Sequence, residues 1–550
     1  MEYLANLGSD VDGFENLVIK HTGRYYTHEF LAKQAIKHLL DELISNKFPK
    51  TTLEVIDPFA GDGRLLLWLI EEWLGRGFPK VKWSLHLWDL MGGVVDDSSG
   101  FLMKLHELKI DFQLSLIKGD SFRIAFENRE KFDIVFTNPP WEMLKPDIRE
   151  VKNLSLDSRL EYLKSLKKYD QWISKNYSLS RPKQKFAGWG TNLSRVGLEV
   201  SHSICRNDGY VLCVLPASFF ADEQSGILRK KILSEYIPIS ISYYPAEAKL
   251  FGKADINSST ILYKKNIATN TPISITVFNK ELEVVSVKVL EHSTLKANRY
   301  SISLTTTSEG LAILKSMSSR FGTWAEQEVR GDIWAGREID ETRIASRLEV
   351  SGSGPRFIKG KMIGRYSTVS CNLHTLIPSV KMLPPSVNYK KIVWRDVSRA
   401  SQRRRLIATI VQEGSVAGNS LGVVYYRNGN EELLKGLLGI MNSFCFEFQL
   451  KSYLSTGHIS LSALRKTSIP YREELIHHKR LIAAVTECLA APSYYNEFVV
   501  EVIVAKDIYG LEVDDFIVVL QSFDKITVEE TQTLTQMYRS LTPNNRKENK

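Results

Sequence analysis

Long apolar runs and a secretion signal are both missing from this chain of 550 residues. The apolar run at 65–70 ends at two glutamates, and a membrane-spanning helix needs roughly 18 such residues. The first twenty residues do not place a basic segment before an apolar one, so nothing in them is typical of a secreted protein. We therefore expect a soluble, cytoplasmic protein that does not contact a membrane.

Cysteine is also scarce, and its spacing excludes the usual stapled folds. There is neither a CxxC pair nor a Cys/His cluster at zinc spacing, and the number of cysteines is odd. They are Cys205, Cys213, Cys371, Cys445 and Cys488. We expect no disulfide framework and no metal site.

The charge is uneven along the chain, although the net excess is a modest +9. Residues 351–410 contain twelve Lys and Arg against the single acid Asp396. Residues 481–530 reverse the balance, with ten acids against Lys506 and Lys525. A concentrated basic window is typical of a surface that binds a polyanion.

Short β-branched or apolar runs alternate with helix-like segments from about residue 50 to 265, a pattern typical of a doubly wound α/β sheet. A helix is expected at 28–44, where apolar residues recur at steps of three and four. The expected strands are 52–57, 84–89, 112–118, 132–137, 210–216, 238–244 and 259–265.

Polar residues follow the first three expected strands at the point where each ends. The first strand leads into DPFAGDG, in which Gly61 and Gly63 suit either a ligand-binding turn or an ordinary tight turn. Asp57, Asp89 and Asp120 are acids at successive strand ends. Because no GxGxxG or P-loop accompanies them, the pattern favours a nucleoside ligand over a pyrophosphate.

The fourth strand is followed by Asn138, Pro139, Pro140 and Trp141. The prolines restrict the backbone so that the Asn138 side-chain carbonyl and the Pro139 main-chain carbonyl can both accept from one amino group. Accepting both hydrogens of a planar, conjugated NH₂ favours a pyramidal nitrogen with an available lone pair. Trp141 offers a face on which a planar group can stack.

With these motifs, the chain resembles the S-adenosylmethionine-dependent amino-methyltransferases, and above all the adenine-N6 DNA methyltransferases of restriction-modification systems. The resemblance covers residues 20–265 and implies a Rossmann-like methyltransferase domain with S-adenosyl-L-methionine as cofactor. Gly23–Thr27 resembles the motif that contacts the methionine end, although His28 stands where proline is usual. The implied cofactor-binding residues are Thr27, Asp57, Phe59, Gly61, Gly63, Asp89, Leu90, Asp120 and Ser121.

The same resemblance assigns the catalytic tetrapeptide and the target base. Asn138, Pro139, Pro140 and Trp141 correspond to the catalytic motif, and we expect Trp141 and Phe251 to stack on an adenine flipped out of the duplex. The motif order, with the methionine motif first and a long C-terminal region last, is the gamma arrangement. Segment 142–208 is interpreted either as a DNA-facing flap or as a helical insertion.

Three segments are predicted: a catalytic domain at 1–270, a mixed α+β target-recognition domain at 271–480 and an acidic helical segment at 481–550. Within the basic window, a helix would place Arg395, Arg399 and Arg403 on one face against DNA phosphates. The predicted DNA-binding residues are Lys391, Arg395, Arg399, Arg403, Arg404 and Arg405.

We expect a monomer that binds double-stranded DNA. A cognate restriction endonuclease is a possible partner in the same system, without a stable complex. An RNA adenine-N6 methyltransferase, a protein-glutamine methyltransferase and an inactive DNA-binding specificity protein are the competing interpretations. The size of the basic C-terminal part disfavours the glutamine enzyme, the intact tetrapeptide disfavours the inactive protein, and a fused nuclease domain is not expected.

Overall fold

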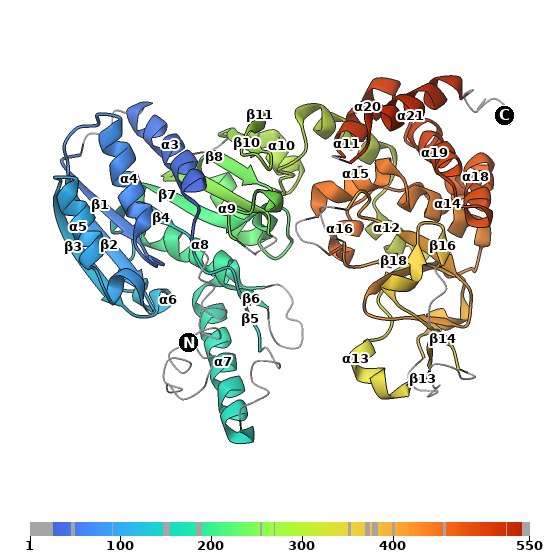
Figure 1. Cartoon of the computed structure of the whole chain (residues 1–550), viewed down its shortest axis with the longest axis horizontal. Coiled ribbons are helices and arrows are strands. Elements are labelled where there is room, and N and C mark those ends of the chain that lie inside the picture. The colour runs from blue at the N-terminus through green and yellow to red at the C-terminus, as the bar shows by residue number, and fades with distance from the viewer. Residues whose placement is uncertain are drawn as a thin grey trace. The chain divides into compact units, whose positions relative to one another are not determined.

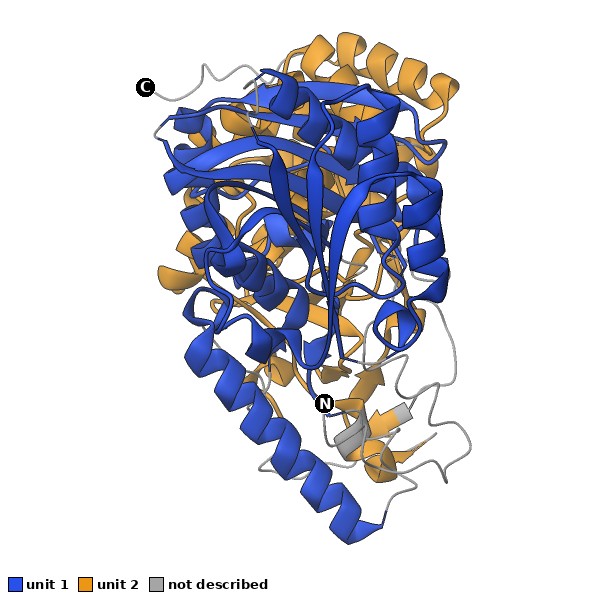
Figure 2. Cartoon of the chain, turned by 90° about the vertical axis from the view of Figure 1, so that its left-hand side faces the viewer, with its two compact units in different colours: residues 1–305 blue, residues 306–550 orange. Residues whose placement is uncertain are grey.

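A computed structural model divides the chain into two compact units, residues 1–305 and 306–550 (Figures 1 and 2). Each unit has its own buried apolar core. The residues that the structure describes are 26–45, 50–90, 92–146, 155–182, 190–252, 256–268, 270–349, 354–368, 374–376, 383–398, 402–454, 458–523 and 525–541.

Unit 1 is built on a nine-stranded sheet in the order β11-β10-β8-β9-β7-β4-β1-β2-β3. The seven strands expected from the sequence are all present, within a few residues at each end, and the doubly wound α/β fold class is confirmed. The sheet strands are β1 Thr52–Asp57, β2 Lys82–Asp89, β3 Asp111–Lys118, β4 Phe132–Thr137, β7 Cys205–Pro216, β8 Tyr236–Tyr244, β9 Ser258–Ile267, β10 Ile273–Phe278 and β11 Val284–Leu290.

The strand order reverses direction at β1, which pairs in parallel with both β2 and β4. In open α/β sheets the crevice beyond the carboxyl ends of the strands at such a reversal is the usual ligand site. β1 and β4 are apolar runs without alternation, because β4 is buried along its whole length and β1 along most of it. The sequence thus places DPFAGDG and the tetrapeptide side by side.

Helices cover the two faces of this sheet (Figure 1). Seven leucine, isoleucine and alanine residues of α3 are buried, at the spacing predicted for an amphipathic helix. The helices are α3 Glu29–Ser45, α4 Arg64–Gly75, α5 Ser99–Glu107, α6 Ser121–Ile124, α7 Leu156–Asn176, α8 Leu193–Ile204, α9 Gly226–Glu235 and α10 His292–Ala297.

The predicted boundary at 270 is wrong, because two further strands extend the sheet. β10 pairs in parallel with β8, and β11 returns antiparallel to β10, which places residues 273–290 in unit 1. The sequence pattern predicted β9 as the last strand, whereas the hairpin of β10 and β11 follows it in the sheet. A strand at the edge of a sheet is specified mainly by its partner strand, and sequence pattern does not reveal that partner.

Unit 2 combines small sheets with a cluster of helices whose apolar faces form one core. Its strands are β12 Ile333–Gly336, β13 Leu348–Glu349, β14 Arg356–Ile358, β15 Ile363–Gly364, β16 Ser367–Thr368, β17 His374–Leu376, β18 Lys391–Arg395, β19 Ala408–Val411, β20 Ser415–Ala417 and β21 Leu421–Tyr426. Its helices are α11 Ser308–Arg320, α12 Trp324–Val329, α13 Glu341–Ile344, α14 Glu431–Met441, α15 Phe444–Tyr453, α16 Leu461–Leu464, α17 Arg472–Leu475, α18 Lys479–Ala490, α19 Tyr494–Ile503, α20 Val513–Gln521 and α21 Val528–Ser540.

The described part of the acidic segment, 481–523 and 525–541, is mainly helical but is not a separate unit. Apolar residues of α18 to α21, among them Leu481, Val500, Phe516 and Leu534, belong to the same core as strands β18 and β21. Glu497, Glu501 and Glu530 pair with basic residues of the window, and Asp507 pairs with Arg480 of α18. Charge composition therefore predicted a domain boundary at 481, but the apolar core of unit 2 continues across it.

The basic window is not a helix with a row of arginines. Lys391 and Arg395 begin and end the strand β18, which pairs with β19 and β21. Lys391 is fully buried in an ion pair of 2.6 Å with Glu338, and the Arg395 guanidinium donates to the carbonyl of Ile363. The predicted assignment of Lys391 to DNA phosphate is wrong, because its charge is satisfied inside the unit. Arg399 lies outside the described residues.

The three consecutive arginines of the window also point to internal partners. Arg404 is buried between Glu447 and Glu501, with ion pairs of 2.9 and 2.7 Å. The Arg405 backbone donates to the Glu447 carboxylate, and its guanidinium donates to the carbonyl of Ser398. Arg403, the most exposed of the three, pairs with Glu530 of α21. The DNA-binding assignment of Arg404 and Arg405 is corrected accordingly: they hold unit 2 together.

Within the described ranges, no helix is both long and apolar enough to cross a membrane. The same residues contain no group of three or more His, Cys, Asp or Glu side chains that could hold a metal ion. Cys205, Cys213, Cys445 and Cys488 are buried free thiols.

Replacing Arg404 with alanine should destabilise unit 2 by about 3–5 kcal/mol, because two buried carboxylates would lose their partner. Arg403→Ala is the matched control and should cost less than about 1 kcal/mol, since its ion pair is partly exposed to solvent. Denaturant unfolding of both variants measures the difference. Equal destabilisation would contradict a structural role for Arg404.

Candidate functional site

The loop after β1 is shaped by hydrogen bonds to the end of the neighbouring strand β2. The Gly61 N–H donates to the Asp89 carboxylate at 2.8 Å, and the Ala60 N–H donates to the carbonyl of Trp88 at 2.9 Å. Gly61 and Gly63 both have positive φ, of 56° and 80°, which other residues rarely adopt. The glycines of DPFAGDG are therefore required by this turn, and the loop opens toward the crevice.

Asp57 lies at the end of β1 with a fully buried side chain. One carboxylate oxygen, Oδ1, accepts from the Thr137 hydroxyl at 2.6 Å and from the Phe59 N–H at 3.0 Å. The other oxygen, Oδ2, is buried without a hydrogen-bond partner. Burial raises the pKa of Asp57 to about 7, and the nearby Asp89 and Asp62 add to the shift. A buried acceptor without a donor indicates a site for a cationic or N–H group of a ligand.

Asp120 caps the N-terminus of the short helix α6 at the end of β3. Its carboxylate accepts from the Phe122 N–H at 3.0 Å and from the Tyr169 hydroxyl at 2.8 Å. Burial raises the pKa of Asp120, and burial together with the adjacent Asp120 charge raises the pKa of Tyr169 well above its usual value. Tyr169 is therefore a neutral donor at this end of the site.

The tetrapeptide follows β4 directly and is supported from below by α8. A Cβ atom on Gly197 of α8 would lie 2.2 Å from the Pro139 Cβ and 3.3 Å from the Phe59 ring. Only a glycine lets the helix approach the turn this closely, so Gly197 sets the position of the two prolines. Asn138 and Pro140 face the pocket, while Pro139 faces the helix.

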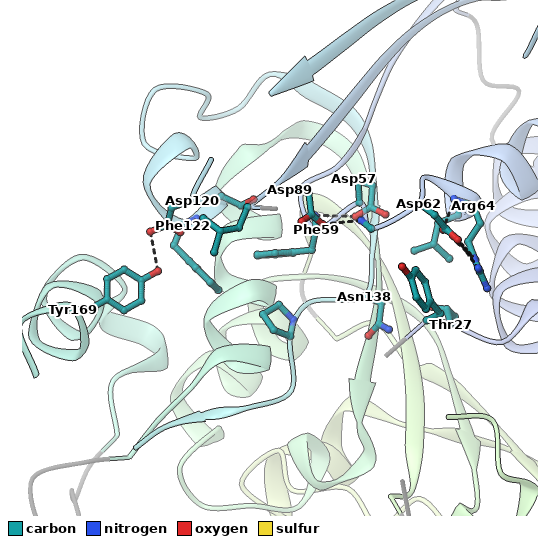
Figure 3. A pocket seen from close by; sticks show the side chains of 17 residues that line it. Thr27, Asp57, Phe59, Asp62, Arg64, Asp89, Asp120, Phe122, Asn138 and Tyr169 are labelled. Atoms are coloured by element: carbon teal, nitrogen blue, oxygen red, sulfur yellow. Dashed lines mark hydrogen bonds and ion pairs between the residues drawn. The ribbon is translucent and has the colours of Figure 1, made fainter. Parts of the chain in front are cut away.

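These elements enclose one open pocket with about 810 Å³ of empty space. Figure 3 shows Tyr169 and Asp120 toward one end, Thr27 and Arg64 toward the other, and Asp57, Phe59 and Asp89 between them. Ten predicted residues line it: Thr27, Asp57, Phe59, Gly61, Asp89, Leu90, Asp120, Ser121, Asn138 and Pro140. The remaining predicted cofactor residue, Gly63, does not line the pocket and is the N-cap of α4.

Trp141 and Phe251 lie together, but against each other. Both side chains are buried, and their ring centroids are 4.7 Å apart at an interplanar angle of 55°. A base inserted between two rings needs a separation of about 7 Å, twice the usual stacking contact of roughly 3.5 Å. In this structure the Trp141 and Phe251 rings are therefore too close together to hold a base between them.

Several residues that line the pocket were not predicted from the sequence. Tyr26 and Arg64 form one corner, where the Arg64 guanidinium lies 4.6 Å from the centre of the Tyr26 ring and pairs with Asp62. The position of Asp62 and Arg64 within DPFAGDGR was a usable signal. Tyr169 gave none, because it lies 49 residues from its partner Asp120 in a segment that sequence pattern could not place.

No protein-family model matches the chain, and no curated protein does. Among solved structures, it is similar to a nuclease-deletion mutant of the Type ISP restriction-modification enzyme LlaGI bound to a DNA substrate mimic, with a TM-score of 0.50 at 10% identity, covering 88% of this chain and 49% of that one. The Type IIL restriction-modification enzyme MmeI in complex with DNA has a TM-score of 0.47 at 12% identity, and the match covers 93% of this chain and 76% of that one. A class I S-adenosylmethionine-dependent methyltransferase from Listeria monocytogenes has a TM-score of 0.31 at 16% identity, covering 48% and 71%.

Unit 1 has a doubly wound, Rossmann-like α/β fold. At such low identity the comparison with LlaGI bears on the fold alone, and the chain spans about half of that enzyme's length. Which group the pocket binds and which substrate it acts on are therefore argued from the residues that line it.

Replacing Gly197 with alanine should destabilise unit 1 by about 1–3 kcal/mol, because the added methyl group collides with Pro139. Gly226→Ala is the matched control at the first residue of α9, where a Cβ meets nothing closer than 3.9 Å. Thermal unfolding of both variants tests the contact, and equal stability of the two would show that α8 does not support the tetrapeptide.

Proposed function

We propose that this protein is a site-specific DNA methyltransferase that transfers a methyl group from S-adenosylmethionine to adenine N6 in double-stranded DNA. The single observation that carries the proposal is the pocket itself, where the Asn-Pro-Pro-Trp turn and three strand-end carboxylates meet. In this interpretation the protein is the modification component of a restriction-modification system, of the gamma motif order, and acts as a monomer.

The pocket fits the cofactor by the chemistry of its donors and acceptors. Asp57 Oδ2 is a buried acceptor suited to the ammonium group of the methionine part, with Thr27 nearby in the lining. Asp89 is placed to hold the ribose hydroxyls, and Asp120 and Ser121 to accept or donate at the adenine edge. Phe59 and Leu90 provide apolar contact. When bound, S-adenosylmethionine supplies an electrophilic methyl group, so no metal or covalent enzyme intermediate is needed.

The target amino group is assigned to the turn after β4. The Asn138 side-chain carbonyl and the Pro139 main-chain carbonyl each accept one N–H of adenine N6, which makes the nitrogen lone pair available to attack the methyl carbon. The N6–CH₃ bond would form as the S–CH₃ bond of S-adenosylmethionine breaks with its electron pair left on sulfur, and N6 would then lose one proton to solvent. The buried bond from Thr137 to Asp57 holds this turn in register with the cofactor loop. Since an amino group inside a stacked duplex cannot reach the pocket, the adenine is extruded.

Entry of the adenine requires Trp141 and Phe251 to part. The loop carrying Phe251 contains Lys249 in the left-handed conformation and Gly252 with a φ of 62°, next to the segment 253–255 that the structure does not describe. We assign Phe251 as the second ring that stacks on the extruded adenine, opposite Trp141.

Duplex DNA is favoured over RNA or protein by the motif resemblance and by the size of unit 2. The two restriction-modification enzymes compared above were solved with DNA or a DNA mimic. Unit 2, residues 306–550, is proposed as the target-recognition domain, whose contacts come from surfaces other than the buried Lys391, Arg404 and Arg405. Arg395, Arg399 and Arg403 stay part of this proposal as DNA-binding residues, although Arg395 and Arg403 also have internal partners.

Asn138→Ala should abolish methylation while the affinity for S-adenosylmethionine stays within about twofold, because the side chain serves only the target nitrogen. Transfer of a labelled methyl group to duplex DNA, followed by sequencing for N6-methyladenine, measures the loss. Asn279→Ala, in the turn between β10 and β11, is the control and should methylate normally. Methylation of RNA but not DNA by the wild type would replace the substrate in this proposal, and near-normal activity of Asn138→Ala would refute the mechanism.

Cofactor affinity should depend on pH through Asp57. Its raised pKa means that the free protein holds a proton there below about pH 7, whereas a bound ammonium group requires the carboxylate. Affinity should therefore level off just above about pH 7, where Asp57 is ionised and the α-ammonium group of the ligand is still protonated, and fall by up to tenfold for each pH unit below it. Calorimetry in buffers of different ionisation enthalpy should detect proton release on binding at about pH 6. Asp57→Asn should bind more weakly at all pH values and lack this dependence, and a wild-type affinity that is flat from about pH 5 to 8 would remove Asp57 from the site.

A further inference from the structure

The long helix α7, Leu156–Asn176, belongs to the insertion of unit 1 that follows the tetrapeptide, and it extends away from the sheet (Figure 1). The two ends of the insertion that carries it are joined by the short antiparallel pair β5, Met143–Leu144, and β6, Thr191–Asn192. The insertion is therefore an arm whose base is held beside the catalytic turn.

One face of α7 anchors this base. Tyr169 donates to Asp120, and Trp172 lies under the Arg123 guanidinium at 5.1 Å. The buried residues of the helix are Tyr162, Leu166, Tyr169, Asp170, Ile173 and Ser174. At 100° per residue these positions share one side of the helix, so the opposite side faces solvent.

That opposite side is a stripe of lysines. Lys164, Lys167, Lys168 and Lys175 are exposed and fall within about 100° of arc at 3.6 residues per turn. Within the part of the chain that the structure describes, none of the four makes an ion pair or a side-chain hydrogen bond. The exposed Glu161 lies at one edge of the stripe, three residues before Lys164, and between Tyr162 and Asn176 the only acid is Asp170, which is buried.

This arrangement differs from the basic window of unit 2, where the described residues that we assigned to DNA have internal partners. Lys391 and Arg404 are buried in ion pairs, and Arg403 pairs with Glu530. A row of cations without partners stays costly through mutual repulsion unless a polyanion neutralises it. The stripe on α7 is thus a better phosphate surface than the window that sequence composition favoured.

We propose that the α7 stripe, Lys164, Lys167, Lys168 and Lys175, binds the phosphate backbone of duplex DNA and holds it beside the catalytic pocket. The stripe is about 16 Å long at 1.5 Å per residue, a length over which a duplex carries about ten phosphates. The inference rests on the proposed function for the identity of the polyanion, since the pocket at the base of α7 is where the target adenine is assigned.

The test is the salt dependence of DNA binding by a variant with all four lysines replaced by alanine. Each lost phosphate contact lowers the slope of log affinity against log salt by about 0.9, so the slope should fall by about 3 to 4. Fluorescence anisotropy with a labelled duplex, between about 50 and 200 mM salt, measures it without requiring methylation. The control replaces four exposed lysines of other helices and loops of unit 1, Lys37, Lys80, Lys230 and Lys296, and should keep the wild-type slope.

Two further measurements separate this inference from the proposed activity. Thermal unfolding and S-adenosylmethionine affinity should match the wild type in the α7 variant, because the stripe faces away from the pocket. One outcome is that the wild type fails to methylate DNA while the salt dependence of DNA binding is still reduced in the α7 variant. That result would refute the proposed activity and support the phosphate-binding surface. If the wild type methylates DNA and the α7 variant keeps the wild-type slope and affinity, the surface is refuted and the activity stands. Tighter, lysine-dependent binding to an RNA duplex of the same sequence would overturn the assignment to DNA.

Discussion

The hydrogen bond from the Thr137 hydroxyl to Asp57 joins the ends of two central strands, β4 and β1, inside the protein. One strand leads into the cofactor loop and the other into the Asn-Pro-Pro-Trp turn, so this contact sets the distance between the two. The same carboxylate holds the Phe59 N–H, and Asp89 of the next strand holds the Gly61 N–H. The pocket is thus preorganised by strand-end acids before any ligand enters, which is what a site that must align two reactants requires.

Preorganisation at Asp57 has an electrostatic cost. A fully buried carboxylate with one oxygen lacking a donor is expensive to keep ionised, and its raised pKa expresses that cost. Unsatisfied polar atoms of this kind concentrate where a ligand completes the hydrogen bonding. In the proposed function, an ammonium group of the ligand completes the hydrogen bonding of this acid, while Thr137 already donates to its other oxygen.

Charge is used in two different ways in the two units. In unit 2, Arg404 with Glu447 and Glu501, and Lys391 with Glu338, are buried pairs that fix how strands and helices meet. Such pairs are strongly destabilising to break, though their net contribution to stability is small. In unit 1, the lysines of α7 stay exposed on an arm whose other face reaches Asp120 through Tyr169. Clustering in sequence therefore did not distinguish structural from accessible cations, because only burial does.

The sequence by itself determined the central sheet and most of the pocket. Apolar strands that end in Asp57, Asp89 and Asn138 can be read from pattern, and parallel pairing necessarily brings their carboxyl ends to one edge. Tertiary structure alone decided the added hairpin β10 and β11, the burial of Lys391 and Arg404, the contact of Trp141 with Phe251, and the arrival of Tyr169 at Asp120. Each of these depends on which distant segment packs against a residue, and local periodicity carries no information about that partner.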